Sequence, residues 1–297
     1  MRFRAPRLDD ATAVLDVLLA RDIADLAVAD HTLDELHDEW RETGFDLASD
    51  ALVAESEAGA IVGYAAVITP GIHAAVAPEH EGQGIGTRLL KWGEHRDRER
   101  GRDRHRQWLA VNNTRGRALL LAAGYQHARS YWRLARSLDD LATAVAPPPR
   151  IHLRPVDVET DAITVHALNE TSFSANADYR PEAITTFVER HLSAHDFDPK
   201  LSCVAEDSGV AIGFLLACRL PDEGIGFVDL LGVNPDYRRR GVATAMLIAT
   251  FEAFALAGLR NAELGVASDN PHALRLYERC GMTPRFQFDS YERAARD

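Results

Sequence analysis

Apolar and polar positions follow a regular plan in the second half of this chain. Two apolar runs, residues 201–206 and 210–219, are separated by Asp207-Ser208-Gly209, a pattern that predicts a β-hairpin. A third apolar run, residues 227–233, stops at a polar turn that contains Pro235. The long apolar stretch that follows, residues 242–257, predicts a helix.

The flanking segments complete the fold prediction. We expect a first strand at 151–155, helices at 159–172 and 181–195, a strand at 261–267, a short helix at 270–280 ended by Gly281, and one or two final strands within 284–291. The resulting order, βααβββαβαβ, predicts a mixed α/β fold. Its sheet should be mainly antiparallel, with helices on both faces.

The first half of the chain repeats this plan. Residues 72–124 align with residues 229–281 without a gap, and the segment 2–10 resembles 151–159. Internal similarity of this kind predicts two related domains. The coinciding positions are Val76 with Val233, Pro78 with Pro235, Gly84 with Gly241, Gly86 with Ala243, Asn113 with Asn270 and Gly124 with Gly281.

The domain boundary is predicted from a proline-rich run. A chain of 297 residues suits two domains of about 150 residues, each with its own core. The run Ala146-Pro147-Pro148-Pro149-Arg150 is incompatible with a helix. We therefore expect an N-terminal domain at 1–140, a linker at 141–150 and a C-terminal domain at 151–297.

The turn after residue 233 has the composition of an anion site. It reads Arg238-Arg239-Arg240-Gly241-Val242-Ala243 and leads into the predicted helix. The first N–H groups of a helix have no intrahelical partner, and the helix dipole favours negative charge there. Arginines add formal positive charge. The segment predicts a site for a phosphorylated cofactor.

These elements in this order resemble the GNAT superfamily of acyl-CoA-dependent N-acyltransferases. The family's pyrophosphate motif, Arg/Gln-x-x-Gly-x-Gly/Ala, stands here as Arg238-x-x-Gly241-x-Ala243. Its second signature is a short helix with an Asn, an Ala and a Leu-Tyr pair, here Asn270, Ala273 and Leu276-Tyr277. The tandem architecture is similar to that of mycothiol synthase, although we identify no feature suited to a glucosaminyl-inositol substrate.

The resemblance implies how acetyl-CoA would bind. The cofactor would lie between the strands at 227–233 and 261–267. Its pantetheine would pair with the backbone of Leu231, Gly232 and Val233, and Asn270 and Ala273 would lie nearby. The pyrophosphate would contact Arg238 and the N–H groups of a continuous run: Arg239, Arg240, Gly241, Val242, Ala243 and Thr244.

The resemblance also implies catalytic roles in the second domain. Tyr277 would protonate the departing thiolate, because a phenol has a pKa close to that of a thiol. The base is open: Asp229 lies on the strand beside the thioester, but its face is not decided by the sequence. Glu263, Glu223 and a water chain are alternatives.

The first copy has lost parts of this machinery. Glu81 stands where the second copy has Arg238, Leu120 where it has Tyr277, and Ile72 where it has Asp229. Gly82, Gly84 and Gly86 still keep the backbone open, so an anion nest can persist. We expect the first domain to be catalytically silent.

Composition and charge argue against several classes of binding partner. The net charge of −12 argues against nucleic acid, and the arginines of residues 96–106 alternate with acidic residues, which predicts a solvated helix end. Three cysteines without metal-ligand spacing and the polar start MRFRAPRLDD lead us to expect a cytoplasmic protein with no metal and no membrane partner. Either a monomer or a homodimer fits.

The sequence thus predicts an N-acetyltransferase that moves an acetyl group from acetyl-CoA to an amine of a small molecule. Three questions stay open: the acceptor's identity, the acyl chain preference, and whether the first domain binds coenzyme A. A non-catalytic acyl-CoA sensor is the alternative. Aminoacyl transfer from tRNA is a third hypothesis, opposed by the acidic charge and the intact phosphate loop.

Overall fold

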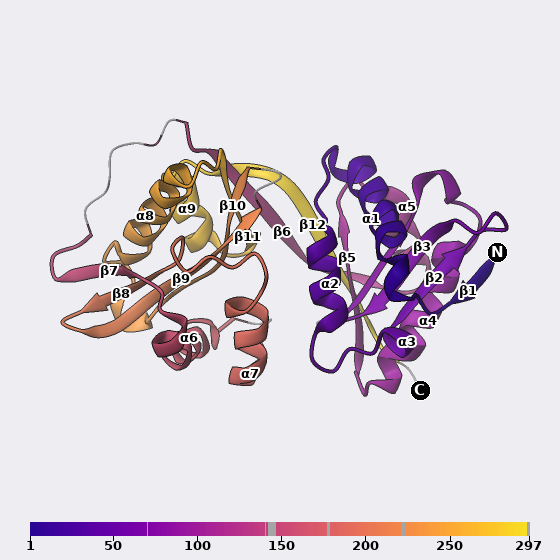
Figure 1. Cartoon of the computed structure of the whole chain (residues 1–297), viewed down its shortest axis with the longest axis horizontal. Coiled ribbons are helices and arrows are strands. Elements are labelled where there is room, and N and C mark those ends of the chain that lie inside the picture. The colour runs from indigo at the N-terminus through magenta and orange to yellow at the C-terminus, as the bar shows by residue number, and fades with distance from the viewer. Residues whose placement is uncertain (70, 140, 142–146, 177–178, 221–223, 296–297) are drawn as a thin grey trace. The chain divides into compact units, whose positions relative to one another are not determined.

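The computed structural model describes residues 1–69, 71–139, 141, 147–176, 179–220 and 224–295. The chain folds into two compact units. Unit 1 consists of Met1–Tyr131 together with Phe286–Asp297, and unit 2 consists of Trp132–Arg285. Figure 1 labels their helices and strands.

Unit 2 has the predicted order of elements. They are β7 (Ile151–Pro155), α6 (Val158–Phe173), α7 (Ile184–Phe187) with the π-helical turn η3 (Val188–Leu192), β8 (Cys203–Asp207), β9 (Val210–Leu220), β10 (Ile225–Val233), α8 (Val242–Leu256), β11 (Asn261–Ala267), α9 (Pro271–Arg279) and the start of β12 (Thr283–Ala294). The strands lie in the order β6-β11-β10-β9-β8-β7. β10 and β11 are parallel, whereas the neighbouring pairs from β7 to β10 are antiparallel.

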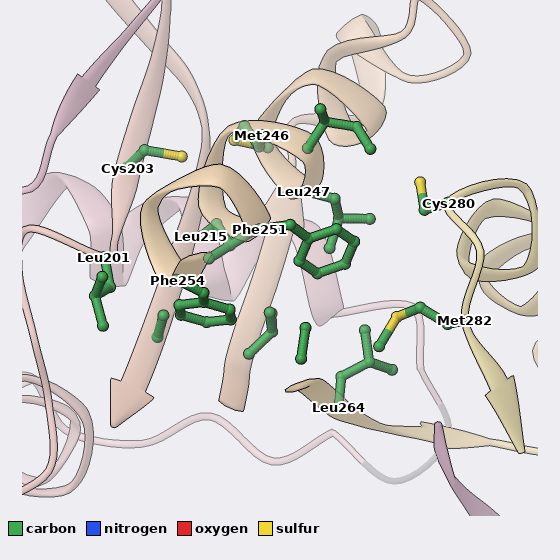
Figure 2. Close-up of a cluster of buried hydrophobic side chains, with 14 of the residues drawn as sticks. Leu201, Cys203, Leu215, Met246, Leu247, Phe251, Phe254, Leu264, Cys280 and Met282 are labelled. Carbon is green, nitrogen blue, oxygen red and sulfur yellow. The ribbon is translucent and has the colours of Figure 1, made fainter. Parts of the chain in front are cut away.

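Two cores cover the faces of this sheet, because successive strand residues point to opposite sides. Phe214 and Leu216 of β9 pack with α6 and α7, while Leu215 and Ala217 pack under α8. Figure 2 shows the second core, to which α8 contributes large apolar side chains that include Met246, Leu247, Phe251 and Phe254. The mixed α/β fold with helices on both faces is confirmed.

Unit 1 follows the same plan. Its elements are β1 (Arg2–Arg4), α1 (Ala11–Leu26), α2 (Leu33–Arg41), α3 (Leu47–Asp50), β2 (Ala51–Glu55), β3 (Ile61–Val67), β4 (Ile72–Val76), α4 (Ile85–Glu99), β5 (Arg104–Ala110), α5 (Thr114–Ala122) and β6 (Gln126–Ser137). Strands β1 to β4 form an antiparallel sheet, and β5 pairs with β12.

The compact units differ from the predicted ranges 1–140 and 151–297 at two strands. β6 begins in unit 1 and ends in unit 2, and β12 does the reverse. The cause is pairing, since residues 288–294 of β12 form an antiparallel ladder with β5 of unit 1. The predicted linker, 141–150, lies partly outside the described residues.

Three local predictions are corrected. The helix expected at 181–195 begins only at Ile184, because Ala183 before it is extended, and it ends in the π turn at Leu192. The tail forms one strand, β12. Within residues 96–106, Asp97 is fully buried rather than solvated, because it hydrogen-bonds to Arg102 and His105.

Candidate active site

The loop before α8 adopts a conformation that opens its backbone toward a ligand. Arg239 and Gly241 both have positive φ, 63° and 86°, with Arg240 between them. Such alternation makes a concave nest of N–H groups. Within the described chain α8 has no side-chain cap at Gly241, whereas Asp157 caps α6 and Asn270 caps α9. The first-turn amides of α8 are therefore free for an anion.

The arginine side chains of this loop also have structural partners. Arg238 donates from Nη2 to the carbonyl oxygen of Ser172 at 2.8 Å and from Nε to that of Val233 at 3.3 Å. Arg240 donates to the carbonyl oxygen of Asp236 and lies over the ring of Tyr237. These bonds fix the loop against the end of α6 and the end of β10.

Strands β10 and β11 pair only at one end within the residues that the structure describes. The parallel register runs from Ile225 and Asn261 to Val228 and Leu264. Beyond this point Leu231, Gly232 and Val233 pair with β9 on one side only. Their other backbone edge can accept an extended, amide-containing ligand. Gly232 itself is required by packing, because an added Cβ would lie 2.4 Å from the ring of Phe214.

A β-bulge decides the direction of Asp229. The register with β9 shifts between Val228 and Leu230. As a result Val228 packs under α8 while Leu230 packs with α6 and α7, although alternate strand residues normally share a face. Asp229 lies at this reversal and turns to the α7 side, which the sequence left undecided.

His191 is the partner of Asp229, and sequence reasoning missed it. Its Nδ1 lies 2.6 Å from Oδ2 of Asp229, and its Nε2 lies 3.8 Å from Oε1 of Glu182. His191 sits in the π turn, a rare geometry that often occurs at functional sites. Burial lowers the pKa of His191, but the hydrogen bonds with Asp229 and Glu182 outweigh it and raise the pKa to about 9. The imidazole is therefore a cation at neutral pH.

Tyr277 lies on α9, partly buried against the core of unit 2. Burial raises the pKa of its phenol to about 12, so the hydroxyl stays protonated at neutral pH. Within the described residues the hydroxyl has no hydrogen-bond partner. Asn270 begins α9 as predicted, since its Oδ1 accepts from the N–H of Ala273 at 3.1 Å.

The rival carboxylates differ in their surroundings. Glu263 is fully buried and is paired with Arg133 at 2.6 Å and with Arg285. Both of its oxygens are thus engaged by guanidinium groups, which makes it a structural ion-pair centre. Glu223 lies outside the described residues.

Unit 1 contains a cavity of about 400 Å³ at the corresponding place. It is lined by β4, by the loop with Gly82 and Gly84 at φ 75° and 79°, and by α4, β5 and α5. The loop conformation thus repeats that of Arg239 and Gly241. Glu81, however, is ion-paired with Arg21 at 2.5 Å and with Arg115 at 3.2 Å.

Among the described residues, no group of three or more His, Cys, Asp and Glu side chains is arranged to hold a metal ion. No described helix is both long and apolar enough to cross a lipid bilayer.

Comparison with known families agrees with the geometry in both units. Residues 165–282 match the Acetyltransferase (GNAT) family, and residues 48–135 match an Acetyltransferase (GNAT) domain. This chain is a tandem GNAT protein. Family membership makes it an acetyl-CoA-dependent N-acetyltransferase, so the prediction of an enzyme of this class is confirmed.

Several known proteins are similar to this chain over most of its length. A mycothiol acetyltransferase of Beutenbergia cavernae is 29% identical over 80% of this chain and 82% of its own length. A mycothiol acetyltransferase of Pseudarthrobacter chlorophenolicus is 29% identical over 94% and 84%. A GCN5-related N-acetyltransferase from Sphaerobacter thermophilus matches with a TM-score of 0.84 at 25% identity, over 100% of this chain and 96% of that one.

A tandem GNAT protein from the clavulanic acid biosynthesis pathway has the same fold. The match has a TM-score of 0.79 at 16% identity and covers 100% of this chain and 99% of that one.

Proposed function

We propose that unit 2 transfers an acetyl group from acetyl-CoA to an amine of a small molecule. The observation that carries this proposal is the open edge of β10 beside the uncapped nest of α8. An extended amide chain fits the first, and a pyrophosphate fits the second. Acetyl-CoA carries both groups.

The residues present suit that cosubstrate. Backbone groups of Leu231 to Val233 would hold the pantetheine, and the N–H groups of residues 239–244 would hold the pyrophosphate. Arg238 and Arg240 position the loop and add positive charge next to it. Asn270 and Ala273 shape the neighbouring end of α9.

The Asp229–His191 pair serves as the base in this proposal. Asp229 is partly exposed on the bulged strand, so it is the member that meets the incoming ammonium group. His191 accepts the proton through Asp229, and Glu182 stabilises the resulting imidazolium. Because the imidazole is already charged at neutral pH, the pair gains basic capacity only as pH rises toward 9.

Tyr277 serves as the acid. A protonated phenol with a pKa of about 12 can donate to the departing thiolate and then recover its proton from solvent. Its hydroxyl is not engaged by other described groups, so it is available to the leaving sulfur.

The acceptor class is inferred from the relatives. The curated relatives are named mycothiol acetyltransferases, which supports a small-molecule acceptor. The test is a release assay for the coenzyme thiol with a panel of amines: unacetylated mycothiol, polyamines and aminoglycosides. Turnover with at least one amine, lost in Asp229→Asn, supports the proposal. Binding of acetyl-CoA without transfer to any amine would favour the sensor alternative.

A further inference from the structure

The cavity of unit 1 keeps its shape but differs in chemistry from its counterpart in unit 2. Gly84 and Asn113 have the same roles as Gly241 and Asn270: a left-handed cap and a side-chain cap. Three other positions in the lining of the unit 1 cavity carry a different kind of side chain from their counterparts in unit 2. Glu81 replaces Arg238, Leu120 replaces Tyr277, and Gln107 replaces Leu264.

Glu81 makes the mouth of the cavity unfavourable for a pyrophosphate. Its carboxylate lies in the loop that would hold the phosphates, and it occupies the guanidinium groups of Arg21 and Arg115. Arg21 is also shared with the buried carboxylate of Asp25. The two arginines and the two carboxylates therefore have no net charge together. A polyanion that entered here would meet the carboxylate of Glu81 at the position where unit 2 has an arginine.

The interior of the cavity is mostly apolar. Side chains from α4, β5 and α5 line it: Ile85, Leu89, Leu90, Leu109, Leu119 and Leu120. A volume of about 400 Å³ lies in the range of small-molecule sites. An apolar body is the ligand part that gains most from this lining.

Gln107 supplies one polar group to the same lining. It is 5% exposed, and its Nε2 interacts only with the hydroxyl of Tyr125, without the geometry of a full hydrogen bond, among the described residues. A buried donor without a full hydrogen bond is costly, so a ligand that brings an acceptor oxygen recovers that cost.

We propose that the cavity of unit 1 binds an uncharged, largely apolar small molecule that carries an amide or carbonyl oxygen, and that it does not accept a pyrophosphate. The Nε2 of Gln107 donates to the ligand oxygen, and the leucine lining covers the hydrocarbon. The charge-balanced mouth excludes ligands with a net charge.

The test uses three probes of equal length on the full chain: hexanamide, hexanoate and hexylammonium, titrated by ligand-observed NMR. Hexanamide is expected to bind roughly tenfold more tightly than either ion. Thr87→Trp, an exposed position at the cavity, should abolish hexanamide binding. Thr244→Trp, its counterpart in unit 2, is the matched control and should preserve it.

Two further variants test the chemistry without filling the cavity. Gln107→Leu installs the residue of the second copy and should weaken hexanamide binding about five- to tenfold. Glu81→Gln frees Arg21 and Arg115 and should raise the affinity for hexanoate severalfold. The proposal would be overturned if hexanamide did not bind, or if either ion bound more tightly than hexanamide. It would also be overturned if Thr244→Trp lost hexanamide binding or if Gln107→Leu left the affinity for hexanamide unchanged.

Binding of ADP tests separately whether the unit 1 cavity excludes a pyrophosphate. With ADP as the probe, the wild-type protein should show no site that Thr87→Trp removes. Glu81→Arg restores the charge found in the second copy and should add one. An ADP site in wild-type unit 1 would contradict the proposal. These results do not depend on catalysis in unit 2.

Discussion

The Nδ1 atom of His191, in a π-helical turn, lies 2.6 Å from Oδ2 of Asp229, on the bulged strand β10. Both irregularities are needed for this contact. The bulge turns Asp229 to the α7 side, and the π turn carries His191. Irregular backbone of this kind often occurs at functional sites, which supports the proposed catalytic role of the pair.

His191→Gln is expected to change the pH dependence of kcat/KM. In the wild type, kcat/KM should rise by about tenfold per pH unit up to a midpoint near 9, where the imidazolium loses its proton. Glutamine cannot titrate, so this limb should disappear and the rate at high pH should fall about 100-fold. The measurement is a pH profile of acetyl transfer from pH 6 to roughly pH 10.

His166→Gln is the matched control for that experiment. His166 lies on α6 and packs on the same Phe187 ring, but it hydrogen-bonds to the carbonyl of Glu182 rather than to Asp229. Its profile should resemble the wild type. If kcat/KM of His191→Gln still rose with pH as in the wild type, the imidazole of His191 would have no role in the mechanism.

The same histidine links stability to pH. Its folded pKa is raised from 6.5 to about 9 by the two carboxylates, so the stabilisation is complete below pH 6.5 and is lost as pH rises through 9. The difference in unfolding free energy between wild type and His191→Gln should shrink by up to about 3 kcal/mol over this interval. Urea unfolding at several pH values measures it; a constant difference would contradict the ion pair.

Tyr277→Phe is expected to slow the chemical step. Loss of a general acid lowers kcat by about 100-fold or more, while acetyl-CoA affinity should stay within about twofold. Single-turnover kinetics and a binding titration separate the two effects. Tyr237→Phe keeps the ring under Arg240 and should leave both quantities unchanged. Equal turnover in Tyr277→Phe would rule out the phenol as the acid.

Glu263→Gln tests the assignment of that carboxylate to structure. This change removes the fully buried carboxylate charge that Arg133 and Arg285 both contact, which should destabilise the fold by about 3 kcal/mol. Activity per folded molecule should persist at a temperature where the variant is folded. A strong loss of kcat with little change in thermal stability would instead identify Glu263 as the base.

The sequence was sufficient where local patterns specify structure. The gapless repeat, the glycine positions of the loop and Asn270 predicted strand, nest and capped helix, and the structure has Gly82, Gly84 and Gly241 with positive φ. The sequence was not sufficient where a strand pairs with residues far away along the chain. The end of β12 pairs with β5, almost 200 positions earlier, as the register Ala294 with Arg104 shows.

His191 and Asp229 show why the candidate site was only partly predictable. A bulge shifts the side-chain phase by one residue, and no residue type at Val228 to Leu230 marks it. His191 belongs to no motif, and its role arises from a π turn that ordinary helical periodicity does not reveal. A buried carboxylate such as Glu263 likewise looks like a base until Arg133 is placed beside it.

The account rests most directly on where acetyl-CoA binds, and calorimetric titration of the full chain measures it. We predict one site per chain, retained in Gly84→Asp and lost in Gly241→Asp. Aspartate tolerates the left-handed backbone of both positions and places a carboxylate in the nest. An added Cβ at Gly241 meets Pro148 at 3.5 Å, an ordinary contact, and none at Gly84. Two sites, or one site lost in Gly84→Asp instead, would contradict the assignment of acetyl-CoA to unit 2.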